Sequence, residues 1–90
     1  MNKYYVRIGE ITLERIVEDF IVYTKDTIDE LENNSLFLSI VDEKIYEMFL
    51  DYAEDWVSWE EFQDYMGIIE IGNWKKEYEN YTSEILYDER

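Results

Sequence analysis

Twenty-three of the 90 residues are Asp or Glu, whereas only eight are Lys or Arg, which gives a formal net charge of −15. So many like charges repel each other in a compact body, and a fold must therefore keep them on its surface. Apolar residues make up 47% of the chain and aromatic residues 18%. Acidic disordered chains usually lack aromatic residues. We therefore expect a folded protein with an apolar core beneath an acidic surface.

The length of the chain limits the number of cores. Ninety residues are enough for one hydrophobic core but too few for two. The chain has no proline and only three glycines, and no linker or internal repeat divides it. We expect residues 1–90 to form a single acidic globular domain, in which short connections join a few elements.

The hydrophobic pattern changes within the first third of the chain. Residues 3–8 are rich in β-favouring types and predict a short strand. From Thr12, apolar residues recur at spacings of three and four, which predicts a helix to about Glu32 with Thr12 as its N-cap. The stripe consists of Leu13, Ile16, Val17, Phe20, Ile21, Thr24, Ile28 and Leu31. Residues 33–35 then interrupt the pattern.

Two more helices are expected in the middle of the chain. The second extends from about Leu36 to Asp55, and a third, short helix begins at Ser58. The apolar face of the second helix consists of Phe37, Ile40 or Val41, Ile45, Met48, Phe49, Tyr52 and Trp56. Ser58 and Glu61 have the spacing of a capping box. Gly67 has the place of a left-handed residue that ends a helix.

The C-terminal third predicts a second strand and a further helix. Residues 68–71 are β-branched and short, and we expect them to pair with residues 3–8. From Trp74 to about residue 87 the aromatic spacing favours a helix over a strand. The predicted fold class is α+β, a small and mostly helical domain with about three to four helices and a short two-stranded sheet.

The composition excludes several kinds of chemistry. The chain contains neither Cys nor His, so catalytic triads and zinc sites built on those residues are excluded. No glycine-rich phosphate loop is present. Paired carboxylates could hydrolyse a glycoside, but 90 residues leave little room for the cleft. We expect no enzymatic activity, no cofactor and no metal.

Residues 57–62 resemble the end of an EF-hand calcium loop, with Glu61 at its twelfth position. The first and third positions would then be Leu50 and Tyr52, which carry no carboxylate or amide oxygen. The sixth position would be Asp55, where the loop requires glycine. These three mismatches exclude the assignment.

The densest acidic stretch extends from Asp42 to Asp64 and contains a single cation, Lys44. On a helix, Glu43, Glu47 and Asp51 fall at i, i+4 and i+8, so that successive carboxylates lie about 6 Å apart along the axis. Like-charge pairs at this spacing destabilise an isolated helix by about 0.2–0.5 kcal/mol each. The predicted partner-binding residues are Glu43, Glu47, Asp51, Glu54, Asp55, Trp59, Glu60 and Asp64.

This row of exposed carboxylates on the predicted second helix has two interpretations. A run of charges is usually only the solvated face of a helix, and Trp56 and Trp59 at helical spacing are more often core than recognition residues. The excess of acids over the whole chain favours a basic partner, because a solvated face normally mixes both signs. A nucleic-acid-binding protein presents Lys and Arg to a row of phosphates, and a row of carboxylates could occupy the same groove. Aromatic side chains near this row of carboxylates, such as Tyr46 and Tyr65, could stack on arginine side chains of the partner.

The sequence therefore predicts an inhibitor that binds a basic nucleic-acid-binding protein by mimicking the charge of nucleic acid. In size, acidity and frequent use of Ile, Asn, Tyr and Glu, the chain resembles phage anti-defence proteins, which block restriction enzymes or CRISPR effectors. This resemblance is one of composition and assigns no residues. Two alternatives stay open: an immunity protein or antitoxin that neutralises a basic toxin nuclease, and a small adaptor that homodimerises through exposed aromatic residues.

The charge and the apolar pattern also bear on location. A net charge of −15 repels nucleic acid and anionic lipid, so we expect the chain to bind neither directly. The N-terminal residues lack the apolar core of a signal peptide, and no apolar run reaches the roughly 20 residues of a membrane span. We expect a cytoplasmic protein, in the host cell if a phage encodes it.

Overall fold

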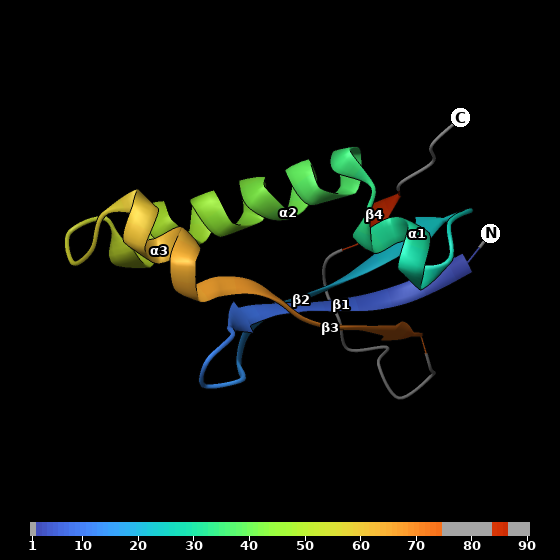
Figure 1. Ribbon diagram of the computed structural model, residues 1–90, viewed down its shortest axis with the longest axis horizontal. Coiled ribbons are helices and arrows are strands. Elements are labelled where there is room, and N and C mark those ends of the chain that lie inside the picture. The colour runs from blue at the N-terminus through green and yellow to red at the C-terminus, as the bar shows by residue number, and fades with distance from the viewer. Residues whose placement is uncertain (1, 75–83, 87–90) are drawn as a thin grey trace.

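The computed structural model describes residues 2–74 and 84–86, which form a sheet with helices on one of its faces (Figure 1). The elements in chain order are β1 (Asn2–Glu10), β2 (Arg15–Thr24), α1 (Ile28–Glu32), α2 (Ser35–Met48), the π-helical turn η1 (Phe49–Ala53), α3 (Trp59–Tyr65), β3 (Met66–Asn73) and β4 (Glu84–Leu86). The sheet has the strand order β3-β1-β2-β4. Strand β1 pairs with β2 and β3 in antiparallel fashion, and β4 joins β2 in parallel.

The fold corrects the prediction of a mostly helical protein with a two-stranded sheet. Where a helix was predicted from residue 12 to residue 32, the structure has strand β2 and then only the short helix α1. Residues 15–24 also satisfy the requirements of a strand, because they are rich in β-branched types. Pairing with β1 gives these residues backbone hydrogen bonds, and packing against the helical layer buries Phe20 and Val22 completely. Tertiary pairing therefore outweighs the local helical spacing.

Thr12, which was predicted to be the N-cap of a helix, lies instead in the turn between β1 and β2. This turn extends from residue 11 to residue 14. Glu14 has a φ of 51°, a left-handed conformation that is uncommon outside glycine. This conformation reverses the chain and brings β2 back along β1.

Two expectations for the C-terminal half are also wrong. Gly67 does not end a helix in the left-handed conformation, because α3 ends at Tyr65 and Gly67 lies within β3. No glycine in the described ranges has a positive φ. The helix predicted from Trp74 to residue 87 is contradicted at residues 84–86, where β4 pairs with Ile21–Tyr23. Residues 75–83 and 87 lie outside the described residues.

Other boundaries follow the capping chemistry of the sequence. Thr27 begins α1 with a capping box, in which its N–H donates to Glu30 Oε1 at 3.0 Å and its Oγ1 accepts from the Glu30 N–H at 3.2 Å. Asn34 caps α2. The cap predicted at Ser58 is present, since its Oγ accepts from the Glu61 N–H at 3.2 Å. The pairing of residues 3–8 with residues 68–71 is also found.

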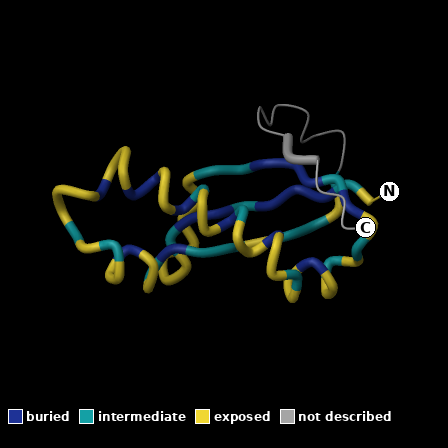
Figure 2. The backbone as a smooth tube through the Cα atoms, turned by 90° about the horizontal axis from the view of Figure 1, so that it is seen from above, coloured by how far each residue is buried: buried dark blue, intermediate teal, exposed yellow. Residues whose placement is uncertain are grey.

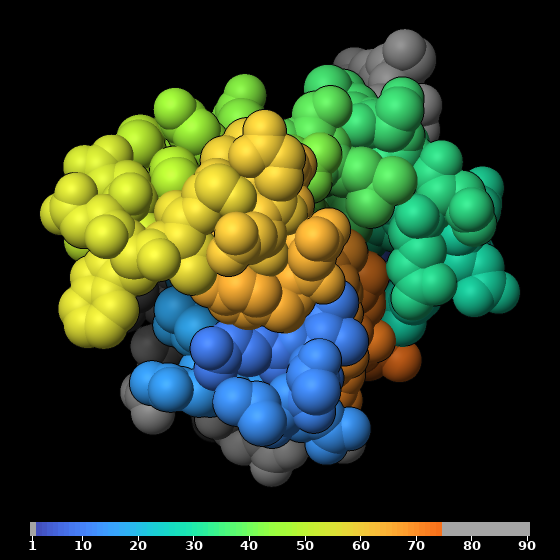
Figure 3. Space-filling model, turned by 60° about the vertical axis from the view of Figure 1, so that its left-hand side comes forward, coloured from blue at the N-terminus to red at the C-terminus, as the bar shows by residue number. Residues whose placement is uncertain are grey.

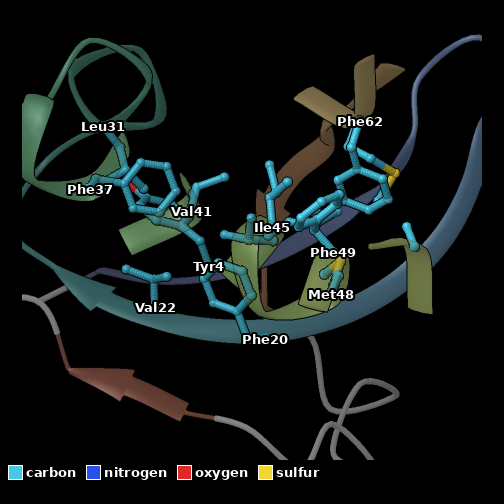
Figure 4. Close-up of a cluster of buried hydrophobic side chains, with 14 residues drawn as sticks. Tyr4, Phe20, Val22, Leu31, Phe37, Val41, Ile45, Met48, Phe49 and Phe62 are labelled. Carbon is cyan, nitrogen blue, oxygen red and sulfur yellow. The ribbon is translucent and has the colours of Figure 1, made fainter. Parts of the chain in front are cut away.

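The core lies between α2 and the sheet, and its side chains interdigitate from both layers (Figure 4). The strands supply Tyr4, Val6, Ile8, Phe20 and Val22, and the helical layer supplies Leu31, Phe37, Val41, Ile45, Met48, Phe49, Ala53 and Phe62. Exposed residues gather on the outer turns of the helices, as Figure 2 shows. The helical layer therefore presents the outer surface on which the predicted site residues lie.

Candidate partner-binding surface

The end of α2 departs from regular α-helical geometry. The Glu54 N–H donates to the carbonyl oxygen of Phe49 at 2.9 Å, a bond that spans five residues instead of four. Such a π-turn holds one residue more than an α-turn, and π-turns are frequent at functional sites. The inward residues here are Ala53 and Val57, each one residue later than a regular α-helix would place them.

This shift corrects the predicted apolar face of the second helix. The buried series ends with Met48, Phe49 and Ala53, and Val57 packs against the core after it. Tyr52 and Trp56, which the regular helical spacing placed inside, are 73% and 85% exposed. Burying a large apolar side chain stabilises a fold by about 1.5–3 kcal/mol, and the structure forgoes that gain at both residues.

Strand β2 has a second irregularity on the same side of the molecule. Ile8 of β1 pairs with Glu18 and Gly9 pairs with Ile16, so that Val17 has no partner on β1. A β-bulge of this kind redirects a side chain and is often found beside a functional site. Val17 is accordingly 45% exposed although it lies within a strand.

The two irregular segments line one open groove of about 460 Å³. Val17 comes from the bulge, Tyr52 and Trp56 come from the π-turn region, and Met48 and Phe62 come from the helices. Glu10 and Arg15 are the charged residues of the lining, and Arg15 Nη1 lies 3.8 Å from Glu10 Oε2. Figure 3 shows the hairpin turn in blue and the segment around η1 in yellow on the same face, beside α3.

Two polar hollows adjoin this groove and share Tyr52 with it. One is lined by three acids, Glu18, Glu47 and Asp51. The other is lined by Asp51, Glu54 and Asp55 together with Trp56. The exposed aromatic residues therefore stand between an apolar groove and two acidic hollows.

The structure places the predicted acids as follows. Glu43 and Glu47 are exposed on α2, Asp51 is exposed in η1, and Glu54 and Asp55 are exposed just after it. The structure brings Glu47, Asp51, Glu54 and Asp55 together around Tyr52.

The predicted residues of α3 lie apart from that group. Glu60 and Asp64 are exposed on α3 and line neither the groove nor the two hollows. The ring of Trp59 packs against the core, with its centroid 5.0 Å from that of Tyr46 and 5.5 Å from that of Phe49. Trp59 therefore supports the aromatic packing under α3.

Lys44, the single cation of the acidic stretch, is turned away from the solvent. Its side chain is only 17% exposed, and its Nζ lies 3.4 Å from Glu18 Oε1 and 4.9 Å from the centroid of the Phe20 ring. Lys44 therefore offsets the charge of Glu18 in the hollow beside Tyr52, while its ammonium group lies away from the solvent-exposed surface of α2. Electrostatically, this surface attracts cations and repels other anions.

Within residues 2–74 and 84–86, no group of three or more carboxylates is placed to hold a metal ion. No helix in the same ranges is long and apolar enough to cross a membrane. The geometry suits contact with another macromolecule, because exposed aromatic side chains beside charged rims are typical of protein interfaces.

Comparison of the chain with protein-family models, with curated proteins and with solved structures finds no match. Its function is therefore inferred from this surface.

Sequence reasoning did not identify Val17, Glu18 and Tyr52 as surface residues of the site. The bulge at Val17 depends on pairing with β1, which the sequence pattern did not predict. For Tyr52 a signal exists, because Phe49, Ala53 and Val57 form an alternative apolar series at spacings of four. With the π-turn in place, this second series faces the core and Tyr52 faces the solvent.

Proposed function

We propose that the chain is a stoichiometric inhibitor that binds the basic nucleic-acid-binding surface of another protein in the cytoplasm. Its carboxylates would take the place of phosphates on the Lys and Arg of that surface. Restriction enzymes and CRISPR effectors belong to this class of partner. An inhibitor of this kind needs no catalytic group of its own.

The observation that carries the proposal is the exposed acidic surface of α2 and η1. The exposed acids are Glu43 and Glu47 on α2, Asp51 in η1, and Glu54 and Asp55 in the turn just after it. Lys44, the single cation of this stretch, pairs with Glu18 and lies over the ring of Phe20, away from the solvent. Since like charges at helical spacing destabilise the helix that carries them, a binding role gives this arrangement a physical reason.

The test is capture of a partner from a bacterial lysate with the tagged chain, eluted in salt steps and identified by mass spectrometry. The proposal predicts a nucleic-acid-binding protein that is released at moderate salt and displaced by added DNA or RNA, since both compete for the same basic surface. A partner that stays bound in molar salt and ignores nucleic acid would contradict it. The identity of the captured protein separates an anti-defence protein from an immunity protein that neutralises a toxin nuclease.

A pair of charge-reversal variants localises the interaction. Glu47→Lys with Asp51→Lys should abolish capture, because both side chains border the hollow beside Tyr52. The matched control is Asp29→Lys with Glu32→Lys, which makes the same change in net charge on the exposed side of α1, at the other end of the molecule (Figure 1). Equal loss of capture in both variants would show that only total charge matters.

A further inference from the structure

The groove beside the acidic hollows differs from them in chemistry. Its lining is mostly apolar, with Met48 and Phe62 from the helices and Val17 from the bulge. Tyr52 and Trp56 stand at its exposed side, and each is more than two-thirds exposed. Two local irregularities, a bulge and a π-turn, thus supply side chains to one apolar concavity.

We propose that this groove binds one large apolar side chain from a basic segment of the partner, while the lysines or arginines beside that side chain contact Asp51, Glu54 and Asp55. This inference rests on the proposed function, because it names the anchor of the same partner. It adds a short-range apolar contact to the long-range attraction of the acidic surface. Anchors of this kind supply most of the binding energy at many interfaces.

The charges around the groove select the occupant. On its lining, Glu10 Oε2 is buried and lies 3.8 Å from Nη1 of Arg15, whose side chain is 73% exposed, so that one negative and one positive charge offset each other. At its edge, the hollow that shares Tyr52 and Trp56 with the groove is lined by Asp51, Glu54 and Asp55. A neutral apolar interior with an acidic edge is complementary to an apolar side chain with basic neighbours.

The same charges disfavour a second copy of this chain as the occupant. Two copies would each bring a net charge of −15 to the contact, and their acidic edges would face each other. Like-charge juxtaposition at an interface opposes association. A basic partner turns that repulsion into attraction.

The experiment uses two synthetic peptides, each with three lysines on either side of one central residue. The central residue is phenylalanine in the first peptide and alanine in the second. Binding of both peptides to the full chain is measured by isothermal titration calorimetry in low-salt buffer. We expect the phenylalanine peptide to bind about tenfold more tightly, because only its ring can fill the groove.

Three variants assign that difference to the groove. Trp56→Ala and Tyr52→Ala should each reduce the preference for phenylalanine to less than about twofold, since each removes part of the groove wall. Leu36→Ala is the matched control, because Leu36 is 55% exposed near the start of α2 and does not line the groove. This variant should keep the full preference.

The outcomes separate this inference from the proposed function. Equal binding of the two peptides, weakened by salt, would overturn the groove assignment and leave the acidic surface as the binding site. Failure of both peptides to bind at low salt would overturn both proposals. A dimer in sedimentation velocity that Trp56→Ala dissolves would show that the groove binds a second copy, and would also overturn the assignment to a basic partner.

Discussion

Val17 and Tyr52 line the same groove, and each lies in a segment that holds one residue more than a regular element would. Val17 is the unpaired residue of a β-bulge, and Tyr52 lies in the π-turn closed by the bond from Glu54 to Phe49. Each irregularity directs an apolar side chain outward at some loss of stability. Their convergence on one concavity is the structural basis of our proposal that a partner binds there.

The two tryptophans around the π-turn should differ sharply in their effect on stability. Trp56→Ala should change the free energy of unfolding by less than about 0.5 kcal/mol, because its side chain is 85% exposed. Trp59→Ala should lower it by about 2 kcal/mol or more, because Trp59 packs on Tyr46 and Phe49. Urea denaturation followed by circular dichroism measures both.

Fluorescence quenching gives an independent check on the same pair. Acrylamide is the suitable quencher, because it is uncharged and the net charge of −15 does not exclude it. Replacing Trp56 with phenylalanine should remove the most strongly quenched component of the emission. A Trp56→Ala variant as unstable as Trp59→Ala would show that Trp56 is part of the core and that the register shift is wrong.

Asp19 should make the protein less stable when it ionises. It lies on β2 with Oδ1 buried and without a hydrogen bond among the described residues, and burial raises the pKa of its carboxyl group above the usual 3.8. The nearby Arg7, with Nε 3.8 Å from Oδ1, lowers that pKa but does not cancel the effect of burial, and Glu18 raises it further. The folded state therefore favours the protonated form, and stability is lost as the pH rises through the folded-state pKa.

Replacement of Asp19 with asparagine removes this ionisation. Asp19→Asn should be more stable than the wild-type protein at pH 7, and the difference should vanish below pH 3.8, where the carboxyl group is protonated in both states. Asp42→Asn is the control for the change in net charge, because Asp42 is exposed on α2. Thermal unfolding at several pH values measures the difference. Lower stability of Asp19→Asn at pH 7 would mean that the ion pair with Arg7 outweighs burial.

The parts of the fold that depend on local chemistry could be predicted from the sequence. Ser58 begins a helix at the predicted place because its side chain accepts a hydrogen bond from the backbone N–H of Glu61. The stripe from Phe37 to Phe49 faces the core because α2 is regular up to that point. The acids on α2 and η1 are exposed because ionised carboxylates are costly to bury.

The parts that depend on distant pairing could not be predicted in the same way. Residues 15–24 have both a helical spacing and a β-branched composition, and only the presence of β1 decides between them. A helix satisfies its backbone hydrogen bonds alone, whereas a strand needs a neighbour, so a local pattern favours the helix. For the candidate site, the consequence was that Val17 and Glu18 were assigned to the wrong element.

Gly9 should tolerate no side chain, because the backbone of β2 approaches it closely at the bulge. A Cβ at Gly9 would overlap the carbonyl oxygen of Arg15, which is fixed by strand pairing. Gly9→Ala should therefore lower the free energy of unfolding by about 2–3 kcal/mol.

Gly67 provides the matched control for that substitution. A Cβ there would meet Cδ1 of Ile11 at 2.6 Å, and this is the end of an exposed side chain that can move aside. Gly67→Ala should change stability by less than about 1 kcal/mol. Similar losses in the two variants would show that β1 and β2 do not approach each other as closely as described.

Deletion of Val17 should preserve the hairpin and remove one wall of the groove. Without it, Glu18 still pairs with Ile8 and Ile16 still pairs with Gly9, so that β1 and β2 form a ladder with no bulge. The shortened chain should therefore keep the circular dichroism spectrum of the full chain. Its preference for the phenylalanine peptide over the alanine peptide should fall to less than about twofold, because the bulge no longer directs an apolar side chain into the groove. An unfolded chain would show that the bulge is needed for the fold, and an unchanged preference would show that Val17 takes no part in binding.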